Sequence, residues 1–188
     1  MSLTFANKIT ICRILAVPFF IAAVFYDSPD KDYLRWTALG IFLFAVISDA
    51  IDGYVARTFR EKTKAGAILD PLADKLLLMS AFICLYYKGS FWHDPIRFPG
   101  WIVIAVISRD LFLVVGGLIL YLVQRTLDVA PTFWGKSTTF LQVVSVIGIF
   151  LQWPFSFIIW DVMLVFTFIS AVDYIRTGMK VLNTGGIK

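Results

Sequence analysis

The chain has 188 residues and a formal net charge of +4; 59% of its residues are hydrophobic and only 16% are charged, with a mean hydropathy of +0.81. Because a soluble domain carries about a quarter charged residues, this composition excludes an ordinary soluble protein and predicts a polytopic membrane protein with a single domain, residues 1–188. The basic residues gather at expected membrane edges, which argues against nucleic acid as a partner.

Six apolar segments predict an all-α bundle of six transmembrane helices, since each is close to the roughly 20 residues that cross a bilayer. In chain order they cover residues 8–27, 34–58, 66–88, 100–125, 135–152 and 155–177. No small-residue cleavage site follows the first segment, so we interpret it as a retained helix and not as a signal peptide.

The distribution of lysine and arginine orients the predicted bundle. With the N-terminus in the cytoplasm, eleven of the 17 basic residues lie on the cytoplasmic side, four lie outside and two fall within spans. Such a bias is typical of cytoplasmic loops. We therefore expect an integral protein of the inner or plasma membrane, with both termini and the site described next on the cytoplasmic side.

Four aspartates, Asp49, Asp52, Asp70 and Asp74, lie in or beside the second and third apolar segments. A carboxylate there costs about 2.5–3.5 kcal/mol on insertion scales, so an intramembrane acid is a candidate functional residue. Four such groups repel one another unless a cation lies among them. An all-oxygen site suits Mg²⁺, Mn²⁺ or Ca²⁺ and not zinc, and two divalent ions balance four acids and clamp a phosphoryl group.

Helical spacing places these acids and several small residues on one face of each helix. The two faces consist of Asp49, Asp52, Gly53 and Ala56, and of Gly66, Asp70 and Asp74. A short basic loop, residues 58–65, joins the two helices, so we expect them to be antiparallel neighbours whose carboxylates line one pocket. The alternative is a structural ion-pair network with Arg57, Lys75 and Arg109, but the interleaved glycines favour a binding site.

The run D-x-x-D-G-x-x-A-R, eight residues, then G-x-x-x-D-x-x-x-D, which spans residues 49–74, matches position for position the motif of the CDP-alcohol phosphotransferase family. With its six spans, the chain resembles this family over nearly its whole length. The resemblance implies that an alcohol attacks the β-phosphorus of a CDP-linked lipid and that CMP leaves. Such phosphoryl transfer depends mainly on positioning and charge neutralisation.

The resemblance also implies roles for single residues. Asp49, Asp52 and Asp70 correspond to the core ligands of two Mg²⁺ or Mn²⁺ ions, and Asp74 lies at the second ion and is the general base. The positions that correspond to the binding of the cytidine diphosphate are Asp52, Gly53, Ala56, Arg57 and Gly66, together with the N-x-x-T-x-x-R pattern of Asn7, Thr10 and Arg13. That last pattern is also consistent with an interfacial helix start and a snorkelling arginine.

Two basic residues are candidates for binding the acceptor alcohol. Arg109 lies near the middle of the fourth segment, where it either binds an acidic acceptor or pairs with Asp110. Lys136 follows Gly135 at the start of the fifth segment, where it either meets an anionic acceptor or lies at the inner membrane surface. This segment lacks the strand and upstream glycine of a P-loop.

The region from Gly66 to Asp74 resembles the phosphatidylglycerophosphate synthases and the related cardiolipin synthases of the family. Basic residues around the pocket favour a phosphorylated acceptor, so we expect transfer of the phosphatidyl group from CDP-diacylglycerol to glycerol 3-phosphate. The Arg109-Asp110 dipeptide resembles the one that cardiolipin synthases tend to carry at the comparable place. Phosphatidylglycerol therefore stays an alternative acceptor, as do the other alcohols used by the family.

The other expected partners are membrane lipids and, by resemblance, a second copy of the chain in a homodimer. Gly116-Gly117 in the fourth segment allows a close helix contact. The non-enzyme alternative is a divalent-cation transporter, which would need acids in the outward halves of the spans to continue a path across the membrane; Asp110 and Asp161 are isolated and provide no such path. A purely structural protein does not account for the glycine–aspartate pattern.

Overall fold

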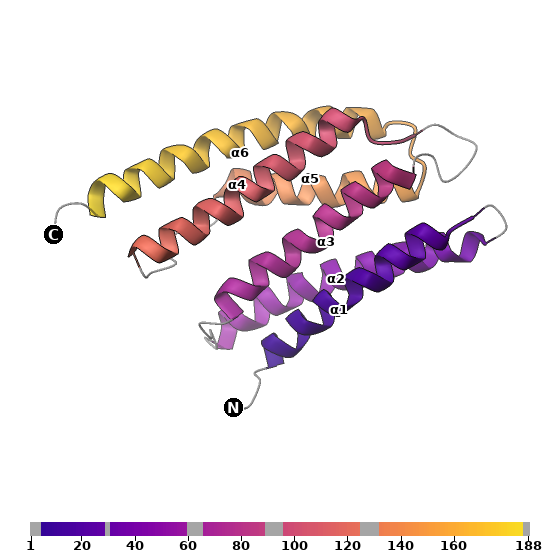
Figure 1. Cartoon of the computed structure of the whole chain (residues 1–188), viewed down its shortest axis with the longest axis horizontal. Coiled ribbons are helices and arrows are strands. Elements are labelled where there is room, and N and C mark those ends of the chain that lie inside the picture. The colour runs from indigo at the N-terminus through magenta and orange to yellow at the C-terminus, as the bar shows by residue number, and fades with distance from the viewer. Residues whose placement is uncertain (1–4, 29–30, 60–65, 89–95, 125–131, 186–188) are drawn as a thin grey trace. The chain divides into compact units, whose positions relative to one another are not determined.

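The computed structural model describes residues 5–28, 31–59, 66–88, 96–124 and 132–185, and within these ranges the regular structure consists of six α-helices (Figure 1). They are α1 (Phe5–Tyr26), α2 (Asp32–Phe59), α3 (Gly66–Lys88), α4 (Gly100–Gln124), α5 (Phe133–Phe150) and α6 (Ser156–Gly185). The all-α prediction is confirmed. The third segment has the predicted bounds, while α6 continues beyond the predicted residue 177.

In the described part of the chain, four helices are long and apolar enough to cross a membrane. Their apolar stretches are Tyr33–Ile51, Gly100–Gly117, Phe133–Phe150 and Ser156–Met179. α1 contributes the shorter apolar stretch Ile11–Tyr26, and α3 begins with the charged residues of the aspartate motif. Large apolar side chains such as Phe19, Phe112 and Phe168 are about two-thirds exposed or more. Lipid satisfies such faces, so the chain is an integral membrane protein.

The chain divides into two compact units, residues 1–98 and residues 99–188. In the first unit, α1 packs against both α2 and α3, whereas α2 and α3 contact each other much less. The expected neighbours α2 and α3 are therefore in contact, although each packs more extensively against α1; most of the motif faces that we expect to meet lie outside the described side chains. The rings of Phe20 and Phe42 lie 6.0 Å apart across the α1–α2 contact, and those of Phe82 and Phe98 stack at 4.5 Å.

The far ends of α1 and α3 are joined by a lysine. Lys88 Nζ at the end of α3 donates to the carbonyl oxygens of Phe25 and Asp27, both at 2.8 Å. The last carbonyls of a helix have no partner within that helix, so this contact satisfies them and fixes the pairing. The opposite end of the unit then gathers the start of α1, the end of α2 and the start of α3 (Figure 1).

In the second unit, α6 packs against both α4 and α5. The close helix contact expected at Gly116-Gly117 occurs within the chain. A Cβ on Gly116 would lie 2.8 Å from Tyr174 Cε1, and the Tyr174 hydroxyl donates to the Leu113 carbonyl at 3.3 Å. The glycine therefore makes room on α4 for a tyrosine of α6.

Candidate active site

Two of the predicted site residues meet at the end of the first unit. Arg13 Nη1 of α1 contacts Asp49 Oδ1 of α2 at 2.5 Å. The Arg13 side chain is 2% exposed, whereas that of Asp49 is 41% exposed. Arg13 lies roughly two turns from the start of α1, and Asp49 lies roughly three turns from the end of α2. The contact thus brings a residue predicted for the nucleotide next to a residue predicted for the metal.

Asp74 lies at a comparable depth, roughly two turns into α3. It is half-buried and follows the fully buried Ala73. The other predicted positions lie on the same three helices, but their side chains fall outside the described residues. These are Asn7, Thr10, Asp52, Gly53, Ala56, Arg57, Gly66 and Asp70.

The described members of the acid cluster suit a hard divalent cation. Asp49 holds Arg13 with one oxygen and is partly open to the surroundings, so its carboxylate is accessible as an anionic oxygen ligand. The Arg13 contact also demonstrates that a positive charge beside Asp49 is stable in this fold. Among the residues with described side chains, no three potential ligands gather into a metal-binding group, and this subset contains Asp49 and Asp74 but neither Asp52 nor Asp70.

In the second unit, Arg109 has the aspartate partner that was one of its two predicted alternatives. Arg109 Nη1 contacts Asp110 Oδ1 at 2.7 Å, and Arg109 Nη2 donates to Ser170 Oγ of α6 at 2.6 Å. The side chain of Arg109 is 3% exposed and that of Asp110 is fully buried. A charge at this depth needs such partners. Direct binding of an acceptor by Arg109 stays a prediction.

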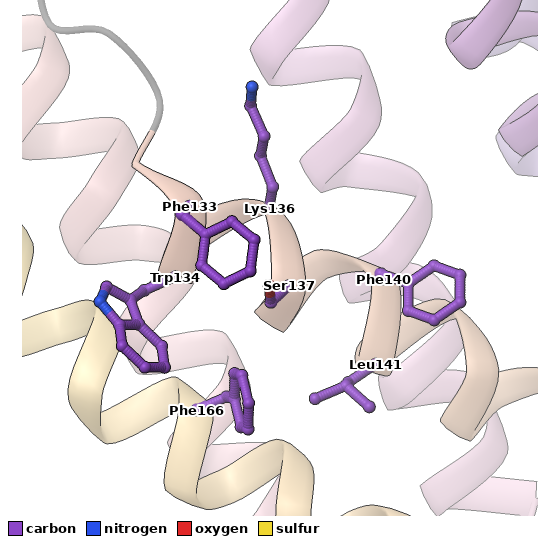
Figure 2. Close-up of a pocket in the computed structure, with 7 residues that line it drawn as sticks. All are labelled: Phe133, Trp134, Lys136, Ser137, Phe140, Leu141 and Phe166. Carbon is purple, nitrogen blue, oxygen red and sulfur yellow. The ribbon is translucent and has the colours of Figure 1, made fainter.

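Lys136 is exposed in the first turn of α5. Thr132 caps this helix, since its Oγ1 accepts from the Gly135 backbone N–H at 3.2 Å. Beside the turn lies an open, mainly apolar groove of about 580 Å³ between α5 and α6 (Figure 2). It is lined by Phe133, Trp134, Lys136, Ser137, Phe140, Leu141 and Phe166. Figure 2 shows the lysine amine pointing away from the aromatic rings.

The polar residues that complete this region were not predicted from the sequence. Gln142 Nε2 of α5 donates to Asp110 Oδ2 at 3.4 Å, and both Gln142 and Ser170 are buried. A signal was present, because Thr138, Gln142 and Ser145 recur at helical spacing, and Gln142 and Ser145 are the polar side chains in the run from Phe140 to Phe150. In a membrane span such a spacing indicates a face that packs against other polar groups.

Comparison with known proteins gives the affiliation of the chain. The family model of CDP-alcohol phosphatidyltransferase matches residues 3–172. A "Probable phosphatidylglycerophosphate synthase" of Mycobacterium tuberculosis is 34% identical over 190 residues, which cover 97% of this chain and 84% of that protein.

Two further relatives carry the name "CDP-diacylglycerol--glycerol-3-phosphate 3-phosphatidyltransferase". The protein of Bacillus subtilis is 32% identical over 95% of this chain and 96% of its own length. That of Aquifex aeolicus is 27% identical over 94% of this chain and 96% of its own length. The family match extends over both units and includes the whole aspartate motif, so the chain belongs to the CDP-alcohol phosphatidyltransferase family.

Proposed function

We propose that the chain transfers the phosphatidyl group of CDP-diacylglycerol to a hydroxyl of glycerol 3-phosphate and releases CMP, a step of phospholipid biosynthesis. The observation that carries this proposal is the family motif of residues 49–74, located on helices whose ends meet around the Arg13–Asp49 contact. The names of the relatives, which match nearly the full chain, support glycerol 3-phosphate as the acceptor.

The reaction forms one bond and breaks another at the β-phosphorus. The acceptor oxygen bonds to this phosphorus, and the bond from it to the oxygen that leaves with CMP breaks. Asp74 accepts the proton of the attacking hydroxyl. Two divalent ions, Mg²⁺ or Mn²⁺, held by Asp49, Asp52, Asp70 and Asp74, would neutralise the diphosphate and stabilise the leaving group.

The rest of the motif serves the nucleotide. Gly53, Ala56 and Gly66 lack bulky side chains, so a diphosphate can approach the helix backbones closely. Arg57 supplies positive charge, and the starting turns of α1 with Asn7 and Thr10 contribute polar groups. Arg13, which contacts Asp49 in the structure, is the proposed link between the metal ligands and this nucleotide region.

Lys136 is the proposed contact for the phosphate of the acceptor. It is exposed at the amino-terminal end of α5, where the backbone N–H groups of a helix favour a negative charge. The strength of such an attraction grows where lipid excludes water. A small phosphorylated alcohol fits this chemistry better than a neutral one.

The membrane arrangement forms part of the same proposal. All six helices span the bilayer, the two termini and the active site face the cytoplasm, and lipids cover the exposed apolar faces. CDP-diacylglycerol then enters from the surrounding lipid, while the soluble acceptor and CMP exchange with the cytoplasm. Two copies of the chain form a homodimer, which is proposed on the family resemblance alone.

One observation favours a second acceptor. Asp110 follows Arg109 and pairs with it. An Arg-Asp dipeptide at this place resembles the one in the cardiolipin synthases. The alternative function is therefore transfer of the phosphatidyl group to phosphatidylglycerol.

An acceptor panel tests the proposal. The purified protein in detergent micelles is mixed with labelled CDP-diacylglycerol, Mg²⁺ and one acceptor at a time, and CMP and the lipid product are identified by mass. Phosphatidylglycerophosphate formed only with glycerol 3-phosphate supports the proposal, whereas cardiolipin formed from phosphatidylglycerol supports the alternative. If none of the acceptors leads to the release of CMP, both functions are contradicted. Uptake of Mg²⁺ into vesicles that contain the protein would then support a transporter.

A further inference from the structure

Four buried polar side chains from three helices meet inside the second unit. They are Arg109 and Asp110 of α4, Gln142 of α5 and Ser170 of α6, and each is at most 4% exposed. The guanidinium is held from two sides, by Asp110 Oδ1 at 2.7 Å and by Ser170 Oγ at 2.6 Å. Gln142 Nε2 holds the second carboxylate oxygen at 3.4 Å. We call this set the Arg109 network.

The Arg109 network lies against the first turn of α5. A Cβ built on Gly135 would be 3.6 Å from Arg109 Nη2 and 3.8 Å from Ser170 Oγ. The guanidinium and the Ser170 hydroxyl therefore border the space beside Gly135, which has room for a methyl group, whereas a larger side chain there would displace them. The two contacts place Gly135 between α4 and α6, one residue before Lys136.

The same turn is also fixed on its aromatic side. The rings of Trp134 and Phe166 lie 5.5 Å apart, which joins α5 to α6. Thr138 is buried and bonds through its hydroxyl to the Trp134 carbonyl at 2.9 Å. With the Gly135 N–H bonded to the Thr132 cap and Trp134 packed on Phe166, the first turn lies directly beside the Arg109 network, and Lys136 points away from the rings (Figure 2).

From this geometry we propose that Asp110 and Ser170 act through Arg109 as positioning residues, which hold the first turn of α5 so that Lys136 meets the phosphate of the acceptor alcohol. This proposal rests on the proposed function, because it concerns the residues that position Lys136, the proposed contact for the acceptor phosphate. Arg109 in this role touches the protein and not the substrate. Its burial favours the role, because a guanidinium that moved away from Asp110 would remove the adjacent positive charge from a fully buried carboxylate.

Ser170→Ala is the most specific test, because it removes the hydroxyl that accepts from Arg109 Nη2 and changes little volume. Losing one hydrogen bond of this kind corresponds to roughly a 3–10-fold change in an equilibrium. We expect the KM for glycerol 3-phosphate to rise by about that factor, while kcat and the KM for CDP-diacylglycerol stay within about twofold. Ser170→Thr keeps the hydroxyl and is expected to restore the KM.

The matched control is Ser145→Ala. Ser145 is a buried serine of α5 whose hydroxyl bonds to the Leu141 carbonyl at 2.7 Å, outside the Arg109 network. Its loss is expected to leave both KM values unchanged. If Arg109 instead bound the phosphate directly, Ser170→Ala would free the guanidinium and leave the acceptor KM equal or lower. That result would overturn the proposal.

Hydrogen exchange in the full-length protein without substrate provides a readout that does not depend on activity. The backbone amides of residues 135–139 are expected to exchange faster in Ser170→Ala than in the wild type or in Ser145→Ala. Unchanged exchange combined with a raised acceptor KM would contradict positioning through the turn. If the wild type uses another acceptor, the proposed function fails, but the exchange comparison still decides whether the Arg109 network holds the turn.

Discussion

At the scale of single residues, the Arg13–Asp49 contact has a consequence for metal dependence. Asp49 is partly exposed and one of its oxygens already meets a positive charge, so Arg13 and the proposed divalent ion would neutralise the same carboxylate. In the absence of metal, Arg13 still supplies a positive charge beside Asp49. The stability of the protein without metal should therefore depend on Arg13 more than its stability with metal does.

Arg13→Ala should lower the free energy of unfolding by about 1–2 kcal/mol in EDTA. In saturating Mg²⁺ the loss should be smaller, because the bound ions supply the missing positive charge. Thermal unfolding of both proteins under both conditions measures this, with about 2–4 °C expected per kcal/mol for a chain of this size. Arg176→Ala, at an exposed position of α6, is the control. Equal losses in EDTA and in Mg²⁺ would show that Arg13 and the metal do not share Asp49.

The general base provides the second prediction at this scale. Asp74→Asn keeps the size of the side chain but removes its capacity to accept a proton, so kcat should fall by roughly 10²–10⁴-fold, with the KM for CDP-diacylglycerol changed little. CMP release under saturating substrates measures the change. Asp161→Asn, the same replacement at an exposed position of α6, should retain full turnover. Full turnover by Asp74→Asn would exclude Asp74 as the base.

At the scale of helices, apolar periodicity and turn residues predicted the helices well but predicted their partners poorly. The predicted segment 66–88 coincides with α3, since Gly66 follows the basic loop 58–65 and Lys88 ends the mainly apolar run that begins at Leu76. Periodicity identifies which residues share a face, but it does not say which helix covers that face. For this reason the family motif could be located from sequence, whereas the central place of α1, the Arg13–Asp49 contact and the partners Gln142 and Ser170 became visible only in the fold.

The contact of α4 with α6 at Gly116 allows a comparison between two adjacent glycines. A Cβ at Gly116 would lie 2.8 Å from Tyr174 Cε1, whereas a Cβ at Gly117 would lie 3.6 Å from the Tyr174 hydroxyl oxygen. Gly116→Ala should therefore be less stable than Gly117→Ala by about 1–2 kcal/mol, owing to overpacking. The helix-propensity gain of about 1 kcal/mol is common to both and cancels. Urea unfolding measures the difference, and Tyr174→Ala should abolish it. Equal stability of the two alanine variants would contradict the packing seen at Gly116.

At the scale of the whole molecule, the proposed reaction requires a specific sidedness. The aspartate motif lies at the end of the first unit where α2 ends and α3 begins, and the connection between α1 and α2 lies at the other end. A site that takes up a charged acceptor and releases CMP has to open to the compartment that holds them. The bias of basic residues along the sequence predicts that this opening faces the cytoplasm.

Labelling of single cysteines in intact cells tests this sidedness. In a variant with Cys12 and Cys84 replaced by alanine, Lys31→Cys lies in the connection between α1 and α2, and Arg176→Cys lies near the end of α6; both positions are exposed. A membrane-impermeant maleimide should label Lys31→Cys in intact cells and should label Arg176→Cys only after the membrane is permeabilised. The same two variants in detergent should label equally, which controls for reactivity. The reverse pattern would place the aspartates on the outer face, where neither the acceptor nor CMP could exchange with the cytoplasm, and the proposed reaction would lose its supply of substrate.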